Sequence, residues 1–123
     1  MIAGPLFALL ALQAGTIDWA ALPALPWRAP PLVTPAMHDF AGREARARRC
    51  PVPQGSSITV ELAVLVDGEG AVRTVVPRAI DCATVEQYAA GLTASFARNN
   101  LLPGSGGAGA QWYKTSLTFS WRK

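Results

Sequence analysis

The chain has 123 residues, of which 50% are hydrophobic and 15% are charged, so the composition excludes wholesale disorder and allows one small domain. The net charge is +3, but the basic residues form no stripe interleaved with aromatic side chains, which argues against a nucleic-acid-binding domain. Two separated cysteines and a single histidine are a poor ligand set for zinc, and no paired carboxylates or Ser/His or Cys/His arrangement is evident. We therefore expect neither a metal or other cofactor nor an enzymatic activity.

Residues 1–17 contain no charged side chain and have a leucine-rich core over residues 6–12. This apolar stretch has the length of a secretory signal rather than that of a membrane span of about 20 residues. Three interpretations stay open: a cleaved signal peptide, a short uncleaved membrane anchor and an ordinary buried segment. The first two would export the rest of the chain.

The segment that follows, residues 19–35, contains five prolines. Proline removes a backbone donor and fixes φ, so we expect an extended linker rather than a regular helix or strand. Trp19 and Trp27 lie in this segment. They either dock on the domain, sit at a membrane interface or are simple loop aromatics.

A basic segment continues the linker over residues 40–49. It combines helix formers with Glu44 and Arg48 at i,i+4 spacing, which predicts a short solvated helix or coil, with its positive charge available to anionic lipid head groups. His38 stands just before it without a partner that would make it a catalyst, so we expect a surface residue.

Residues 57–66 alternate apolar side chains with small or polar ones, the period of two that places successive residues on opposite faces of a sheet. The turn residues Asp-Gly-Glu-Gly at 67–70 follow, and a β-branched run resumes at residues 72–76. This pattern predicts a β-hairpin. A lone hairpin is marginally stable, so another element must cover its apolar face.

The two cysteines flank this hairpin. Its geometry brings Cys82 opposite a position near residue 55, within easy reach of Cys50. A disulfide would close a loop of 31 intervening residues and stabilise the domain by roughly 3 to 4 kcal/mol. Two buried free thiols are the alternative, whereas an oxidised pair indicates an extracytoplasmic compartment.

A helix is predicted after the second cysteine, because Thr84 and Gln87 have capping-box spacing. Its apolar stripe follows at helical spacing and consists of Val85, Tyr88, Ala89, Leu92 and Phe96. We expect these aromatics to lie in the core rather than in a ligand site. The helix should end near residues 99–100 and Pro103.

Residues 104–110 are rich in glycine and predict a loop, without the Gly-Lys-Ser/Thr ending of a phosphate-binding loop. Residues 112–121 alternate again and predict a third strand. The order β-β-α-β predicts an α+β fold: a small three-stranded antiparallel sheet with one helix packed on one face.

This succession over residues 50–121 resembles the carboxy-terminal domain of TonB and its relatives. The resemblance rests on the alternating strand, on a D-G-x-G-x-V turn made by Asp67, Gly68, Gly70 and Val72, and on a helix, a proline-closed loop and an aromatic-rich last strand. It implies a periplasmic domain of Gram-negative bacteria, of a family that passes energy from an inner-membrane complex to outer-membrane receptors.

In that family a receptor segment pairs as an added strand with the terminal strand of the domain. Carried over to this chain, the partner-binding edge strand consists of Tyr113, Lys114, Thr115, Ser116, Leu117, Thr118 and Phe119. We expect Lys114, Ser116 and Thr118 to face away from the helix-covered side.

The sequence thus predicts a signal peptide or anchor over residues 1–17, a linker over residues 18–49 and a TonB-like domain over residues 50–123. The expected function is that of an exported periplasmic module, inner-membrane anchored if its amino terminus is not cleaved. It would bind a protein or extended peptide, with an outer-membrane receptor as the implied partner. A secreted or envelope structural domain without an energy-transducing role is the alternative, and a strand-swapped homodimer stays open.

Overall fold

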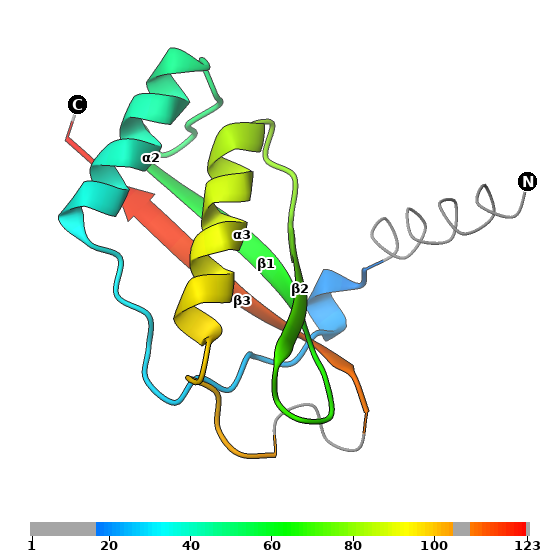
Figure 1. The fold of residues 1–123 in the computed structure, drawn as a ribbon. Coiled ribbons are helices and arrows are strands. Elements are labelled where there is room, and N and C mark those ends of the chain that lie inside the picture. Colours follow the sequence, from blue (N-terminus) through cyan, green and yellow to red (C-terminus); the bar gives the residue numbers. More distant parts are fainter. Residues whose placement is uncertain (1–16, 105–108, 123) are drawn as a thin grey trace, which may run out of the picture.

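The computed structural model describes residues 17–104 and 109–122. A three-stranded antiparallel sheet in the order β2-β1-β3 forms one layer, and two helices cover one of its faces (Figure 1). The elements are the 3-10 helix η1 (Trp19–Ala21), α2 (Pro35–Ala47), β1 (Ser57–Val66), β2 (Val72–Pro77), α3 (Ala83–Ala97) and β3 (Gln111–Ser120). The α+β class and the three-stranded sheet are therefore as predicted. The expected signal or anchor falls almost wholly outside the described residues.

The β1–β2 hairpin is confirmed, and its turn is held by a side chain as well as by the backbone. The Asp67 carboxylate accepts hydrogen bonds from the amides of Glu69 (2.9 Å) and Ala71 (3.0 Å). Gly70 has a φ of 83°, a conformation that glycine adopts without steric cost. These contacts fix where β2 begins.

β1 is the central strand, but its two neighbours cover it unequally. It pairs with β3 over its whole length, from Ser57 opposite Ser120 to Val66 opposite Gln111. Its pairing with β2 begins only at Leu62, opposite Pro77. The first half of β1 therefore has a strand on one side only.

The core lies between the sheet and the helices. Its largest fully buried side chains are Phe119, Leu62, Val60, Val64, Val66, Val85 and Thr93. Tyr88 of α3 stacks between two aromatic rings, with centroid distances of 4.5 Å to Phe40 and 5.8 Å to Phe119. The prediction that Tyr88 belongs to the core is confirmed.

The predicted capping box at the start of α3 is wrong. The N-cap is Cys82, whose side chain makes no capping bond. Instead, the Glu86 carboxylate accepts from the amides of Ile80 (2.9 Å) and Cys82 (3.1 Å). The helix begins at Ala83, earlier than expected. Cys82 is disulfide-bonded to Cys50, with 5.3 Å between the Cα atoms, as the sequence predicted.

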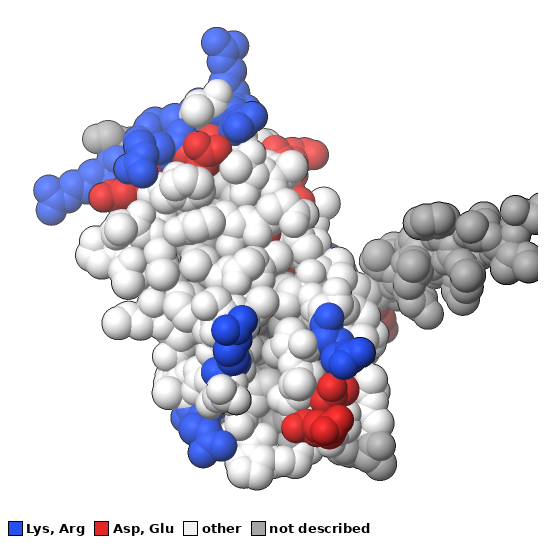
Figure 2. All heavy atoms as spheres, in the orientation of Figure 1, with Lys and Arg blue, Asp and Glu red and all other residues white. Residues whose placement is uncertain are grey.

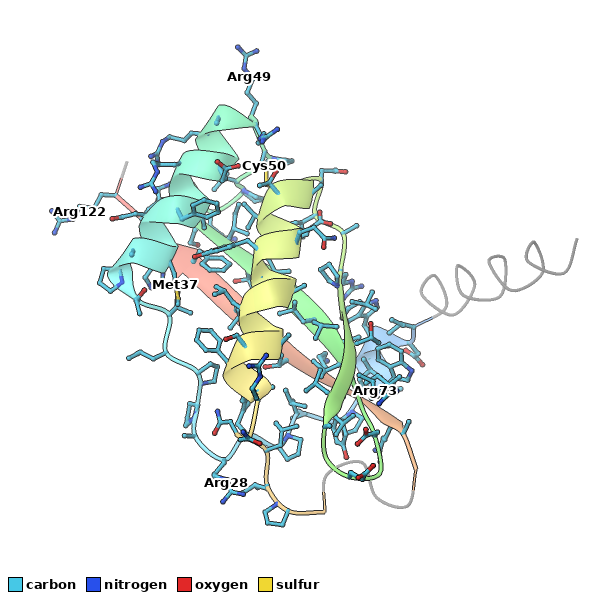
Figure 3. The ribbon with its side chains drawn as sticks, viewed as in Figure 1. Arg28, Met37, Arg49, Cys50, Arg73 and Arg122 are labelled. Atoms are coloured by element: carbon cyan, nitrogen blue, oxygen red, sulfur yellow. A yellow bond between two sulfur atoms is a disulfide. The ribbon has the colours of Figure 1, made fainter. Side chains whose placement is uncertain are left out.

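α2 differs from the expected linker with a short solvated helix or coil. It is a helix of 13 residues that begins at Pro35 and is capped by Thr34, whose hydroxyl accepts from the Met37 amide at 3.3 Å (Figure 3). Ala41 and Ala45 are buried in the core. Two helices rather than one therefore pack on the sheet.

The rest of the expected linker is ordered as well, and we call residues 18–34 the N-terminal strap. It begins with η1 on the open face of the sheet, where the Arg78 guanidinium lies 5.4 Å from the Trp19 ring centroid. It then passes the outer edge of β3, where Leu25 becomes buried. Figure 1 shows it continuing beneath the end of α3 toward α2.

Hydrogen bonds fasten the second half of the strap to the residues that follow α3. Arg28 donates its amide to the Asn100 carbonyl at 2.6 Å. The Asn100 side chain accepts from the Ala29 amide (3.0 Å) and donates to the Ala29 carbonyl (2.9 Å). The indole N–H of Trp27 donates to the Thr115 hydroxyl at 3.1 Å. Trp27 therefore docks on the domain, which was one of the open alternatives.

Candidate functional site

The candidate site is the outer edge of β3, where the sequence places the partner-binding strand. Tyr113, Leu117 and Phe119 are buried on the helix side. Because side chains alternate along a strand, Lys114 and Ser116 lie on the opposite, open face, as does Thr118. The structure thus gives the strand the orientation that was expected.

The backbone groups of β3 alternate in the same way. Lys114 turns both its N–H and its C=O away from β1, because these groups bond to the Pro23 carbonyl and the Leu25 amide, each at 2.8 Å. In an antiparallel ladder the residues two and four positions along share this direction. The backbone groups of Ser116 and Thr118 therefore point outward from the sheet.

Within the stretch from Lys114 to Ser120, the chain itself occupies both ends of this outer edge. The strap pairs with Lys114 at one end, as a short parallel bridge through Ala24. At the other end, the Ser120 amide donates to Nδ1 of His38 at 2.9 Å. His38 also packs edge-on against Phe119, with 6.4 Å between ring centroids. His38 is a structural residue at the strand end.

What remains between these two contacts is a gap of two outward-facing residues, Ser116 and Thr118. Within the described part of the chain, no group bonds to their outward N–H and C=O. Both residues are exposed. The open edge is thus narrower than the seven residues that the sequence suggested, because the strap and His38 cover its ends.

The surroundings of the gap are polar. The hydroxyls of Thr59 and Thr118 are hydrogen bonded across the strands at 2.8 Å. Glu61 lies opposite Ser116 and pairs with the Arg78 guanidinium at 3.2 Å. The gap can therefore accept and donate backbone hydrogen bonds at the two-residue spacing of an extended peptide, with hydroxyl groups beside it.

A second unpaired stretch lies on β1 and was not predicted. The Arg78 amide donates to the Glu61 carbonyl at 2.8 Å, so Ser57 and Thr59 share that direction and face the side where β2 has already ended. Beside them is a hollow of about 420 Å³ lined by Pro51, Pro53, Gln54, Ser57, Ile58, Thr59, Ile80 and Asp81. The signal that predicts it is the unequal length of the two predicted strands, ten residues against about five.

The described part of the chain holds no candidate metal centre. In residues 17–104 and 109–122, no three His, Cys, Asp or Glu side chains are grouped closely enough to hold a metal ion. The pKa of Asp67 is lowered by the Ala71 amide, further by the Glu69 amide and the Arg73 guanidinium, and partly raised again by desolvation. This pKa shift arises in the hairpin turn, at the end of β1 that is remote from the gap.

Among residues 17–104 and 109–122, none of the helices has both the length and the apolar character needed to cross a bilayer.

Comparison with known proteins adds no family assignment. No protein-family model matches the chain, and no similar protein was found among curated proteins or solved structures.

Proposed function

We propose that this protein is an exported interaction module that binds an extended peptide segment of a partner protein by strand addition at the gap of β3. The observation that carries the proposal is the pair of outward-facing residues, Ser116 and Thr118, whose backbone groups have no partner among the described residues. An edge strand with free N–H and C=O groups is a template for another strand.

The size of the gap limits the affinity. Two outward residues supply four backbone hydrogen bonds, each worth about 1 kcal/mol net, so the backbone alone gives about 4 kcal/mol and millimolar binding. Tighter binding requires side-chain contacts beside the gap, or a partner that displaces the strap from Lys114 and lengthens the paired region. We therefore expect a weak, reversible interaction.

Three observations favour a compartment outside the cytoplasm. The Cys50–Cys82 disulfide is typical of proteins in oxidising environments. Residues 1–17 have the composition of a signal or anchor, and the resemblance to TonB-like domains implies the periplasm. On this proposal the partner is an envelope protein, and an outer-membrane receptor is the candidate that the resemblance supplies.

Peptide selection followed by substitution tests the proposal. Peptides selected from a displayed random library on the folded, oxidised protein are titrated against Ser116→Pro, which removes one outward amide while leaving the bonds to β1 in place. Ser116→Ala, which keeps the amide, is the matched control. We expect Ser116→Pro to weaken binding at least about tenfold, the loss of roughly one hydrogen bond plus the register it fixes, and Ser116→Ala to bind like the unmodified protein.

Thr118→Pro repeats the test at the second outward amide, and far-ultraviolet circular dichroism checks that each variant is folded. Equal binding to Ser116→Pro, Thr118→Pro and the unmodified protein would contradict strand addition at β3. If NMR chemical-shift changes on adding the peptide were confined to Ser57 and Thr59, the peptide would instead be assigned to the hollow beside β1.

A structural domain without a peptide partner is the second candidate. The specific observation in its favour is that the chain covers both ends of the β3 edge itself, through the strap at Lys114 and through His38 at Ser120. On this alternative, selection yields no peptide whose binding depends on the Ser116 amide.

A further inference from the structure

The net positive charge of the protein is concentrated at one end. Residues 35–49 and 122–123 contain six of the eleven cationic residues but only two of the eight acidic ones. The remaining chain has five cations against six acids, so this end has a net charge of +4 and the rest of the chain −1. Figure 2 shows the corresponding cluster of basic side chains over α2, with a few acidic ones among and beside them.

We define the basic end as five exposed arginines that lie in α2, directly after it or directly after β3: Arg43, Arg46, Arg48, Arg49 and Arg122. Arg48 pairs with Glu44 at 3.6 Å. In the described part of the chain the other four have no carboxylate within 4.0 Å. Figure 3 shows Arg49 and Arg122 extending away from the body of the protein. These guanidinium groups are therefore available to an external anion.

Two separate segments contribute to this surface. Arg43 and Arg46 are three residues apart on α2 and so lie on neighbouring positions of the helix surface. Arg122 follows β3 and joins them around a hollow of about 620 Å³. The other residues that line this hollow are Pro35, His38, Asp39, Ser120 and Trp121.

The fold does not require arginine at these positions. The buried side of α2 consists of Ala41, Gly42 and Ala45, and the exposed side needs only polar helix formers. Arginine differs from other polar residues in its permanent charge and in a planar fork of donors that matches phosphate oxygens. Several unpaired guanidinium groups at one end therefore point to a phosphate-bearing partner.

We propose that the basic end docks on the phosphate groups of an anionic lipid surface. Charge complementarity supplies the attraction, because basic side chains near an anionic leaflet each add favourable energy. A cluster of exposed basic side chains is typical of a surface that binds anionic lipid head groups.

Nucleic acid fits this surface less well. A single-strand binder tracks the backbone along a groove with several stacking aromatics, whereas this hollow is lined by one tryptophan and by the Asp39 carboxylate. The basic end also lies beyond Ser120, outside the gap at Ser116 and Thr118. Lipid docking is therefore independent of peptide binding at β3.

Vesicle co-sedimentation tests the proposal on the full, oxidised chain. Vesicles of phosphatidylcholine alone are compared with vesicles that also contain phosphatidylglycerol, at low and at raised ionic strength. The variant is R43Q/R46Q, and the matched control is R73Q/R98Q, which removes the same charge from exposed arginines elsewhere. Thermal unfolding checks that both are folded.

We expect the unmodified protein to sediment more strongly with the anionic vesicles than with phosphatidylcholine alone, and salt to abolish this difference. R43Q/R46Q should bind them about tenfold or more weakly, whereas R73Q/R98Q should bind like the unmodified protein. Three outcomes would each overturn the proposal: no binding to anionic vesicles, equal loss in both double variants, or release of the bound protein by inorganic phosphate or a single-stranded oligonucleotide at the same ionic strength. Displacement by phosphate would assign the site to a free phosphate ester, and displacement by the oligonucleotide would assign it to nucleic acid.

Discussion

Single residues decide how closely α2 approaches the sheet. A Cβ atom added at Gly42 would lie 2.7 Å and 2.8 Å from ring atoms of Trp121. The missing side chain therefore permits the helix to pack on the last aromatic residue of the chain. From the sequence, Gly42 only weakened the predicted helix, because its contact with Trp121 joins positions 79 residues apart.

Gly42→Ala should destabilise the protein, although alanine favours a helix by about 1 kcal/mol over glycine. The added methyl group must displace Trp121 or α2, an overpacking cost of about 1 to 3 kcal/mol, so we expect little change at best and a net loss of up to about 2 kcal/mol. Urea unfolding monitored by tryptophan fluorescence measures this change in the free energy of unfolding. Gly91→Ala in α3 is the control, because nothing lies within 4 Å of its added Cβ and it should stabilise by about 1 kcal/mol. An equal gain in stability for Gly42→Ala and Gly91→Ala would contradict the close contact between Gly42 and Trp121.

Asp67 makes the hairpin sensitive to acid. Its pKa in the folded protein is below the usual value of 3.8, chiefly because it accepts the Ala71 amide. The stabilisation that its charge provides is therefore complete above pH 3.8 and is lost as the pH falls through the lowered pKa. We expect Asp67→Asn to be less stable than the unmodified protein at pH 7, with a smaller difference near pH 2. Urea midpoints at the two pH values measure this, and an equal difference at both would contradict it.

Among the secondary-structure elements, the sequence predicted those that are specified by local residue patterns. β1, β2, α3 and β3 have periodic apolar residues that specify both the element and its buried face. The strap and most of α2 have no comparable pattern, since their order depends on distant partners such as Asn100 for Ala29 and Lys114 for Leu25. The open gap in β3 could not be located for the same reason: its limits are set by the strap and by His38.

The strap should contribute to stability through Leu25, which is only 4% exposed. We expect Leu25→Ala to cost about 2 to 4 kcal/mol because it leaves a cavity among Val64, Tyr113 and Leu101. The Lys114 amide should then exchange its hydrogen faster, since its bond to the strap weakens. Leu32→Ala, at an exposed position, is the control and should leave the urea midpoint unchanged. A Leu25→Ala protein as stable as this control would show that the strap is not part of the folded unit.

For the whole molecule, the disulfide joins the residues after α2 to the start of α3 across the hairpin. Reduction of the disulfide removes the loop closure, which the chain-entropy model expects to stabilise the protein by roughly 3 to 4 kcal/mol. This is a large part of the stability of a small domain. We expect the thermal midpoint to fall markedly with reductant. Cys50→Ser/Cys82→Ser should reproduce the reduced midpoint and no longer respond to reductant. An unchanged midpoint on reduction would remove the structural argument for an oxidising compartment.

The central claim, that β3 offers two free backbone positions to an extended partner, is tested most directly by residue-resolved amide hydrogen exchange, with and without a selected peptide. In the free protein, the Ser116 and Thr118 amides should exchange quickly and the Leu117 amide slowly, because Leu117 bonds to β1. Peptide binding should protect Ser116 and Thr118 and leave Leu117 unchanged. Slow exchange at both positions in the free protein, or protection at Ser57 and Thr59 instead, would contradict strand addition at this edge.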